Sequence, residues 1–135
     1  MKLEVKNKLG EVYYSAQYNS KDNCVVSEWR GYVSAEEVIA AVQQVMDSFG
    51  DLKFSNSLND SSKGEGSWDE ANDWLAKNWI PYAIANGLKR FAFIVSDDVF
   101  SAMSSDDLVT KIPGAGLEMR TFQTRAEGEA WLKSA

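Results

Sequence analysis

The stretch LKRFAFIV, from Leu88 to Val95, decides the fold class of this 135-residue chain. Its last five residues form a continuous apolar run, without the polar alternation of a strand that has one face in water. A strand of this kind is buried on both faces, which is typical of a parallel sheet covered by helices. We therefore predict an α/β fold built around this strand.

Three helix starts are predicted from capping boxes. In a capping box, a Ser or Thr side chain accepts a hydrogen bond from a backbone N–H three residues later, and a Glu at that position reaches back. The three pairs are Ser34 with Glu37, Ser67 with Glu70, and Thr124 with Glu127. The first helix is predicted to end at Gly50. The second contains Pro81, which lacks a backbone donor and should kink or split that helix.

The N-terminal third has the period of strands instead. Strands are predicted over residues 3–6, 12–18 and 24–33, and later ones over 53–58 and 117–122. The predicted order is an N-terminal antiparallel meander followed by α-β-α-β-α-β-α. This order gives a mixed sheet covered by helices, in a single domain of residues 1–135.

Composition argues against several classes of function. The net charge is −6 without a basic cluster, so we do not expect a nucleic-acid partner. The chain has no histidine, which removes His-based catalysis and the common zinc sites, so we expect no enzyme and no cofactor. No apolar run is long enough for membrane insertion and the start lacks a secretory signal, which predicts a cytoplasmic location. The one cysteine, Cys24, lies in an apolar run and is predicted to be a small buried side chain.

Two pairs of adjacent carboxylates could in principle hold Mg²⁺ or Ca²⁺. The pairs are Asp97-Asp98 and Asp106-Asp107. Helix geometry gives both a simpler explanation: Asp98 can cap the turn before Phe100, and the second pair can lie in the first turn of a helix over residues 105–112. We therefore expect no metal site.

The stretch NDSSKGEGSW, residues 59–68, is the first candidate for a binding surface. Following the predicted strand 53–58, it places Asp60, Ser61 and Ser62 in a loop at a carboxyl strand end, where ligands usually bind in α/β sheets. Ser67 and Trp68 then open the second helix. We expect these five residues to contact a partner or to carry regulation.

The second predicted helix is rich in aromatic residues. Trp68, Trp79 and Tyr82 share one face, and Trp74 lies beside it. One interpretation is core packing against the sheet, and the other is a surface or pocket for an apolar ligand. The spacing leaves the exposure of Trp74 open. Trp74, Trp79 and Tyr82 are therefore the candidates for contact with a small apolar ligand or lipid.

Several short motifs resemble a known family. They are CVVSEWRGYVS at 24–34, WIPYA at 79–83, GLKR at 87–90, DVF at 98–100 and GLEMRTF at 116–122. Together they resemble small bacterial proteins of the STAS-like family, named for the sulfate-transporter and anti-sigma-factor-antagonist domain. The resemblance runs from about Tyr18 to Leu132. It implies a small α/β domain with helices mainly on one side of a mixed sheet, related in fold to the CRAL-TRIO lipid-binding domains.

The resemblance also implies a function. In the anti-sigma antagonists, a serine of a D-S-[ST]-G-like motif at a helix start is phosphorylated, which disrupts partner docking. Asp60-Ser61-Ser62 is similar to that motif, but Lys63 replaces its glycine, and Ser67 fits the helix-start position better. We therefore predict a non-enzymatic regulatory or protein-interaction domain with a protein partner, which is compatible with a homodimer. The alternative is a carrier or sensor of a small apolar ligand or lipid.

Overall fold

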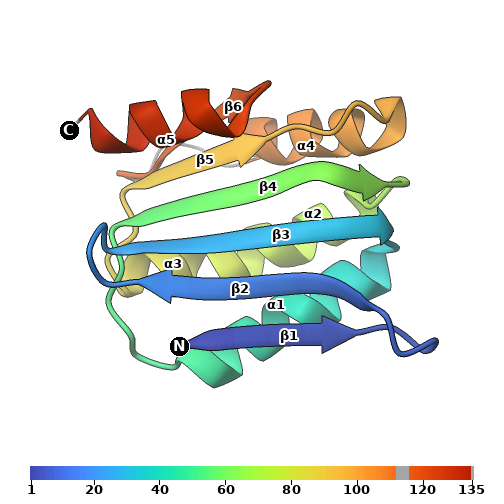
Figure 1. Ribbon diagram of the computed structural model, residues 1–135, viewed down its shortest axis with the longest axis horizontal. Helices are drawn as coiled ribbons and strands as arrows, with labels where there is room; N and C mark the ends of the chain where they lie inside the picture. The colour runs from blue at the N-terminus through green and yellow to red at the C-terminus, as the bar shows by residue number, and fades with distance from the viewer. Residues whose placement is uncertain (112–115, 135) are drawn as a thin grey trace.

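The computed structural model describes residues 1–111 and 116–134, and within them a six-stranded sheet in the order β1-β2-β3-β4-β5-β6 forms the centre of the protein (Figure 1). The first three strands pair antiparallel, and β3 to β6 pair parallel. This arrangement confirms the predicted meander and mixed α/β sheet. The strands are β1 Lys2–Lys6, β2 Val12–Asn19, β3 Cys24–Tyr32, β4 Asn56–Glu65, β5 Arg90–Ile94 and β6 Glu118–Phe122.

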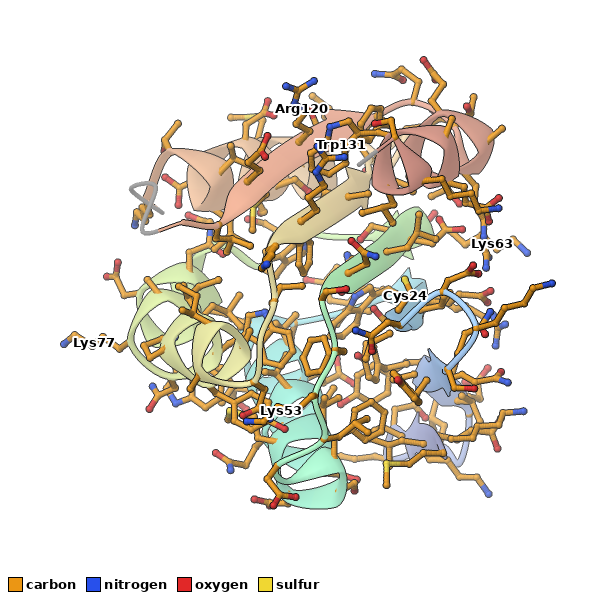
Figure 2. All side chains as sticks on the ribbon, turned by 90° about the vertical axis from the view of Figure 1, so that its left-hand side faces the viewer. Cys24, Lys53, Lys63, Lys77, Arg120 and Trp131 are labelled. Carbon is orange, nitrogen blue, oxygen red and sulfur yellow. The ribbon has the colours of Figure 1, made fainter. Side chains whose placement is uncertain are left out.

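Helices cover both faces of the sheet unequally. The helices α1 to α4 pack with the larger hydrophobic core on one face, and α5 packs with Leu58, Ala92 and Ile94 on the other. Figure 2 places α5 on the side of the sheet opposite to α3 and α4. The helices are α1 Ala35–Phe49, α2 Asn72–Trp74, α3 Ile80–Ala85, α4 Val99–Lys111 and α5 Arg125–Lys133.

Two of the three predicted capping boxes are confirmed. The Ser34 hydroxyl accepts from the Glu37 N–H at the start of α1, and Thr124 accepts from the Glu127 N–H at the start of α5. Gly50 ends α1 with φ +55°, a conformation that favours glycine. The local sequence determines these helix starts because the bonds join residues three positions apart.

The predicted capping box at Ser67 is wrong. The Ser67 hydroxyl bonds to the Asp69 carboxylate at 2.7 Å, and the segment begins instead with a 3₁₀ turn, Asp69–Ala71. The Trp68 N–H donates to the Ser104 hydroxyl of α4 at 3.0 Å. A partner from another helix therefore takes the place of the local cap.

The segment after this turn is irregular, as Pro81 predicts. A π-helical stretch, Leu75–Trp79, separates α2 from α3, and Pro81 lies in the first turn of α3. Pro81 lacks the N–H that a continuous helix would need there, and the wider π turn accommodates this loss. The helix is therefore split one turn before the proline.

The strand β4 differs most from its prediction. It extends through Glu65, so the predicted loop at residues 59–62 is wrong. Between Glu28 and Arg30 the neighbouring strand β3 advances two residues, while β4 advances three, from Asp60 to Lys63. The extra residue is a β-bulge at Ser61-Ser62. This bulge interrupts the alternation of inward and outward side chains. Because the strand is also rich in polar residues, its second half lacks the sequence pattern of a strand.

The helix α4 also differs from the prediction. It is continuous over Val99–Lys111, so Asp106 and Asp107 lie in its interior and the predicted first-turn position is wrong. Asp98 is confirmed as its cap, since the carboxylate accepts from the Ser101 N–H at 3.1 Å. The Asn72 amide donates to Asp107 and Lys111 lies beside it, which lowers the pKa of Asp107. The predicted helix end at Ile112 lies outside the described residues.

Cys24 is buried between the sheet and α5, as its apolar neighbours predict. Burial raises the pKa of its thiol to about 11. None of the described helices combines the length and the apolar character needed to cross a membrane.

Candidate functional site

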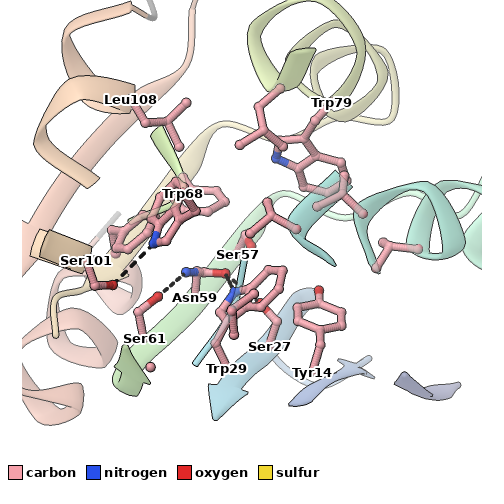
Figure 3. Close-up of a pocket in the computed structure, with 18 of the residues that line it drawn as sticks. Tyr14, Ser27, Trp29, Ser57, Asn59, Ser61, Trp68, Trp79, Ser101 and Leu108 are labelled. Carbon is pink, nitrogen blue, oxygen red and sulfur yellow. Dashed lines mark hydrogen bonds between the residues drawn. The ribbon is translucent and has the colours of Figure 1, made fainter. Parts of the chain in front are cut away.

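A cavity lies between the sheet and its main helical layer (Figure 3). Its volume is about 60 Å³. Side chains of β2, β3, β4 and β5 line it from the sheet, and side chains of α1, α4 and the split aromatic segment line it from above. The cavity is a candidate binding site because its walls are apolar and its floor is polar.

The strand β4 supplies the polar floor. Ser57, Asn59 and Ser61 alternate along it toward the cavity, while Leu58 packs on the opposite face with α5. The three polar residues are between 2% and 7% exposed. Buried polar groups are costly unless they find partners, so their arrangement bears directly on the role of the cavity.

Asn59 joins the floor into one hydrogen-bonded network. Its side-chain oxygen accepts from the Trp29 indole N–H at 2.8 Å and from the Ser27 hydroxyl at 3.1 Å. Its amide nitrogen donates to the Ser61 hydroxyl at 3.1 Å (Figure 3). All of these groups are neutral, and together they offer donors and acceptors without a net charge.

Ser57 and Tyr14 complete the floor. Ser57 is 2% exposed and lines the cavity, and within the described part of the chain its hydroxyl is not joined to the Asn59 network by a side-chain hydrogen bond. Burial raises the pKa of the Tyr14 hydroxyl well above its ordinary value, and the neighbouring Ser27 hydroxyl partly offsets this effect. Tyr14 is therefore a neutral phenol at physiological pH.

Trp68 closes the cavity from the helical side. Its indole N–H donates to the Ser101 hydroxyl at 3.2 Å, and its ring stacks on Phe93 with centroids 6.0 Å apart. Together with the bond from its backbone N–H to Ser104, these contacts hold α4 over the sheet. The position of this wall therefore depends on α4.

The five residues predicted as a contact surface separate into two environments. Ser61 and Trp68 are buried and line the cavity. Ser62 and Ser67 are exposed, and Asp60 is partly exposed on the α5 side, 3.7 Å from Arg125. The Ser62 hydroxyl donates to Asp60 at 2.6 Å. The structure therefore does not bring these five side chains together on one surface.

The aromatic candidates also divide. Trp79 lines the cavity and stacks with Phe54, with centroids 6.5 Å apart. Trp74 is partly buried against the main core, outside the cavity lining. The Tyr82 hydroxyl donates to the Gly50 carbonyl at 2.6 Å and lies outside the lining as well. Of the three, Trp79 is the residue placed to contact a ligand there.

Four large apolar side chains are exposed around one end of the sheet. Tyr32 ends β3, and Val99, Phe100 and Met103 lie in the first turns of α4; each is at least 60% exposed. We call these four residues the edge patch. Gly66 links the end of β3 to the start of α4. The Tyr32 ring packs against Gly66, and the Gly66 N–H donates to the Asp98 carboxylate just before α4. Figure 1 shows the end of β3 and the start of α4 on the same side of the molecule.

The polar floor is not among the features predicted from the sequence. The signal was present as polar residues at every second position, Ser57, Asn59 and Ser61, which is the alternation of a strand. Alternation alone does not say which face meets water, and polar residues normally favour the solvent face. The direction of these three side chains toward the cavity is fixed by the position of the helices, which the alternation in the sequence does not report.

The polar groups of the floor are a serine-rich set with one amide and one neutral phenol. Ser, Asn and neutral Tyr can orient a ligand, while a nucleophile and its activating base would need a titratable pair. In residues 1–111 and 116–134 there is no group of three His, Cys, Asp or Glu side chains placed to hold a metal ion.

Comparison with known proteins identifies the fold of this chain and does not identify a function. No protein-family model matches the sequence, and neither does any curated protein. The structure is similar to the crystal structure of an uncharacterized protein from the DUF3478 family with a SpoIIAA-like fold from Shewanella loihica PV-4. The similarity covers 88% of this chain and 91% of that one, with a TM-score of 0.55 and 16% sequence identity. The chain therefore has the SpoIIAA-like, STAS-like fold that its motifs predict.

Proposed function

We propose that this protein is a non-enzymatic regulatory or protein-interaction domain that contacts its partner through the edge patch. The observation that carries the proposal is the gathering of four exposed apolar side chains. Large exposed apolar side chains that cluster commonly mark interaction sites. Aromatic side chains, tyrosine among them, are enriched among the residues that contribute most to binding, and Tyr32 is such a side chain.

The charges around the patch indicate the kind of partner. Glu65 pairs with Tyr32 in the sheet, Asp97 lies two residues before Val99, and Asp106 follows Met103 by one turn of α4; all three carboxylates are exposed. A partner with an apolar centre and a basic rim would complement this arrangement. A second copy of this chain would place the same acidic rim against itself, so a homodimer through this patch is disfavoured.

A site-specific cross-linking experiment tests the proposal. A photo-reactive amino acid at position 100 in the native host should capture one defined partner, and the same probe at the exposed Leu9 of the β1–β2 hairpin should not. The purified partner should then bind the free chain directly. Replacing Phe100 and Met103 together by serine should weaken that binding at least about tenfold, because hot-spot side chains dominate binding energy.

Leu9→Ser is the matched control, since Leu9 is 82% exposed and lies on the β1–β2 hairpin. Added salt should also weaken binding of the wild-type chain, because salt screens the attraction between its acidic rim and the basic rim of the partner. Equal affinity of the wild type and the Phe100/Met103 double variant for the captured partner would reject the edge patch as its contact surface.

A second candidate function, a carrier or sensor of a small apolar ligand, is supported by the cavity. An apolar pocket with a few convergent polar groups is the usual form of a small-molecule site. Native mass spectrometry of freshly purified protein should then reveal a bound small molecule. Protein that carries no added mass and gains none from a panel of small apolar compounds would reject this candidate.

A further inference from the structure

We propose that the cavity recognises a small neutral molecule that has one hydrogen-bonding head group, such as a short alcohol or a short primary amide. A free carboxylic acid, which is an anion at neutral pH, is excluded by the same chemistry. The inference rests on the second proposed function, ligand binding in the cavity, and specifies the class of ligand.

The size of the cavity limits the ligand. At about 60 Å³ it is smaller than an engineered protein cavity of about 150 Å³ that holds benzene. A molecule of roughly three to five non-hydrogen atoms fits, or the end of a longer one that enters from the rim. A complete membrane lipid does not fit.

The charge of the lining determines the head group. Of the described residues that line the cavity, Glu65 is the one that carries a charge, and it is exposed. An anion would therefore meet a like charge at Glu65 and no cation inside. Burial of an ion without a counter-charge is far more costly than burial of a neutral polar group, so the cavity selects against carboxylates.

The floor provides the matching partner for a neutral head. The Asn59 oxygen already accepts two bonds, and its amide is engaged with Ser61. The Ser57 hydroxyl, by contrast, is not joined to this network by a side-chain hydrogen bond within the described part of the chain, and Ser57 is 2% exposed. A hydroxyl or amide in the cavity can donate to Ser57 and accept from it, which gives this cavity-lining hydroxyl a partner.

The indole N–H signals of the protein provide a direct readout. Trp29, Trp68 and Trp79 line the cavity, while Trp74 and Trp131 do not. We would record NMR spectra of ¹⁵N-labelled protein at neutral pH during titration with three probes of similar size: 1-propanol, propionate and xenon. Shifts of the cavity indoles report binding, and the other two indoles are internal controls.

Saturable shifts of the cavity indoles with 1-propanol are expected. Propionate should bind more than about tenfold more weakly, because it must lose its hydration without a counter-charge. Ser57→Ala should weaken 1-propanol about two- to tenfold, the value of one hydrogen bond, and leave xenon binding unchanged. Ser62→Ala is the matched control, since Ser62 lies on the same strand outside the cavity.

The outcomes separate the two levels of the proposal. If 1-propanol and xenon bind equally and Ser57→Ala has no effect, the head-group inference fails while the cavity remains a ligand site. Tighter binding of propionate than of 1-propanol would likewise reject the head-group inference and leave the cavity as a ligand site. If none of the three probes shifts the cavity indoles, both the inference and the ligand-binding function are rejected.

Discussion

At the scale of single residues, the neighbours Ser61 and Ser62 occupy opposite environments. Ser61 is 3% exposed inside the cavity, whereas Ser62 is exposed and bonded to Asp60. A modifying enzyme can therefore reach Ser62 in the folded protein and cannot reach Ser61. Any phosphorylation switch in this stretch would have to act at Ser62 or Ser67.

Acidic substitutions should separate the two serines. Ser61→Glu places an unpaired carboxylate in the cavity and should lower the free energy of unfolding by at least about 3 kcal/mol. Ser62→Glu leaves the charge in water and should cost less than about 1 kcal/mol. Urea denaturation followed by tryptophan fluorescence measures both. Similar losses for the two variants would contradict the buried position of Ser61.

Asn59 is expected to be the most sensitive residue of the floor. In Asn59→Ala, the Trp29 indole and the Ser27 hydroxyl lose their shared acceptor. Because buried groups without partners cost about 1–3 kcal/mol each, we expect a loss of about 2 kcal/mol in the free energy of unfolding. Asn56→Ala, at the partly exposed start of the same strand, should cost much less. Equal losses in denaturation experiments would show that the Asn59 network contributes little.

At the scale of elements, features that depend on hydrogen bonds within one turn could be predicted from the sequence. Features that depend on contacts with another element could not. The starts of α1 and α5 could be predicted because Ser34 and Thr124 bond within their own turns. The start of the aromatic segment could not be predicted, because the Trp68 N–H donates to the Ser104 hydroxyl of α4, a residue distant in the sequence. Likewise, the length of β4 depends on pairing with β3, and its polar residues carry no apolar signal.

The contact of α5 with the sheet depends on a residue without a side chain. A Cβ at Gly128 would lie 2.7 Å from Ile94 Cδ1 and 3.2 Å from Leu58 Cδ1. Gly128→Ala gains about 1 kcal/mol of helix propensity and should lose about 1–3 kcal/mol to overpacking. We expect a net destabilisation, measured by urea denaturation.

The variant Ile94→Val supplies the control for Gly128, since it removes the atom nearest to the new Cβ. Gly128→Ala should then cost less in the Ile94→Val background than in the wild type, and a double-mutant cycle measures the difference. Strictly additive effects would show that the helix shifts away without strain.

At the scale of the whole molecule, the alternation of strands and helices was enough to predict the mixed sheet, while the cavity was not predictable. Its lining comes from residues as distant in the chain as Tyr14, Ser57 and Leu108. Each of them has an ordinary local pattern, and a cavity is a property of how several layers fail to fill space. Sequence periodicity reports which face is buried, but not how densely it is packed.

Stability of the whole protein should decrease at alkaline pH. Burial raises the pKa of Cys24 to about 11 and that of Tyr13 to about 12, above their ordinary values of 9.0 and 10.0. As the pH rises above 9, the unfolded chain releases protons that the native protein retains, so the free energy of unfolding falls. The contribution is complete below pH 9 and is lost as the pH passes the folded values.

Urea denaturation at a series of pH values measures this decline. Cys24→Ala should show a shallower decline between pH 9 and 11, because the thiol contribution is absent. Identical pH profiles of the wild type and Cys24→Ala would contradict the raised pKa of the thiol.

The bulge in β4 constrains how this chain can change length during evolution. Beyond the bulge, Lys63 points toward the side of α5 in Figure 2, and Gly64 lines the cavity. Deletion of Ser62 would restore regular pairing with β3 and leave every later residue of the strand on its present face, because Lys63 would follow Ser61 directly and still pair with Arg30. A lineage could therefore lose this one residue without moving a charge into the cavity, whereas loss of Leu58 from the regular part of the strand would exchange the faces of the residues on one side of the deletion.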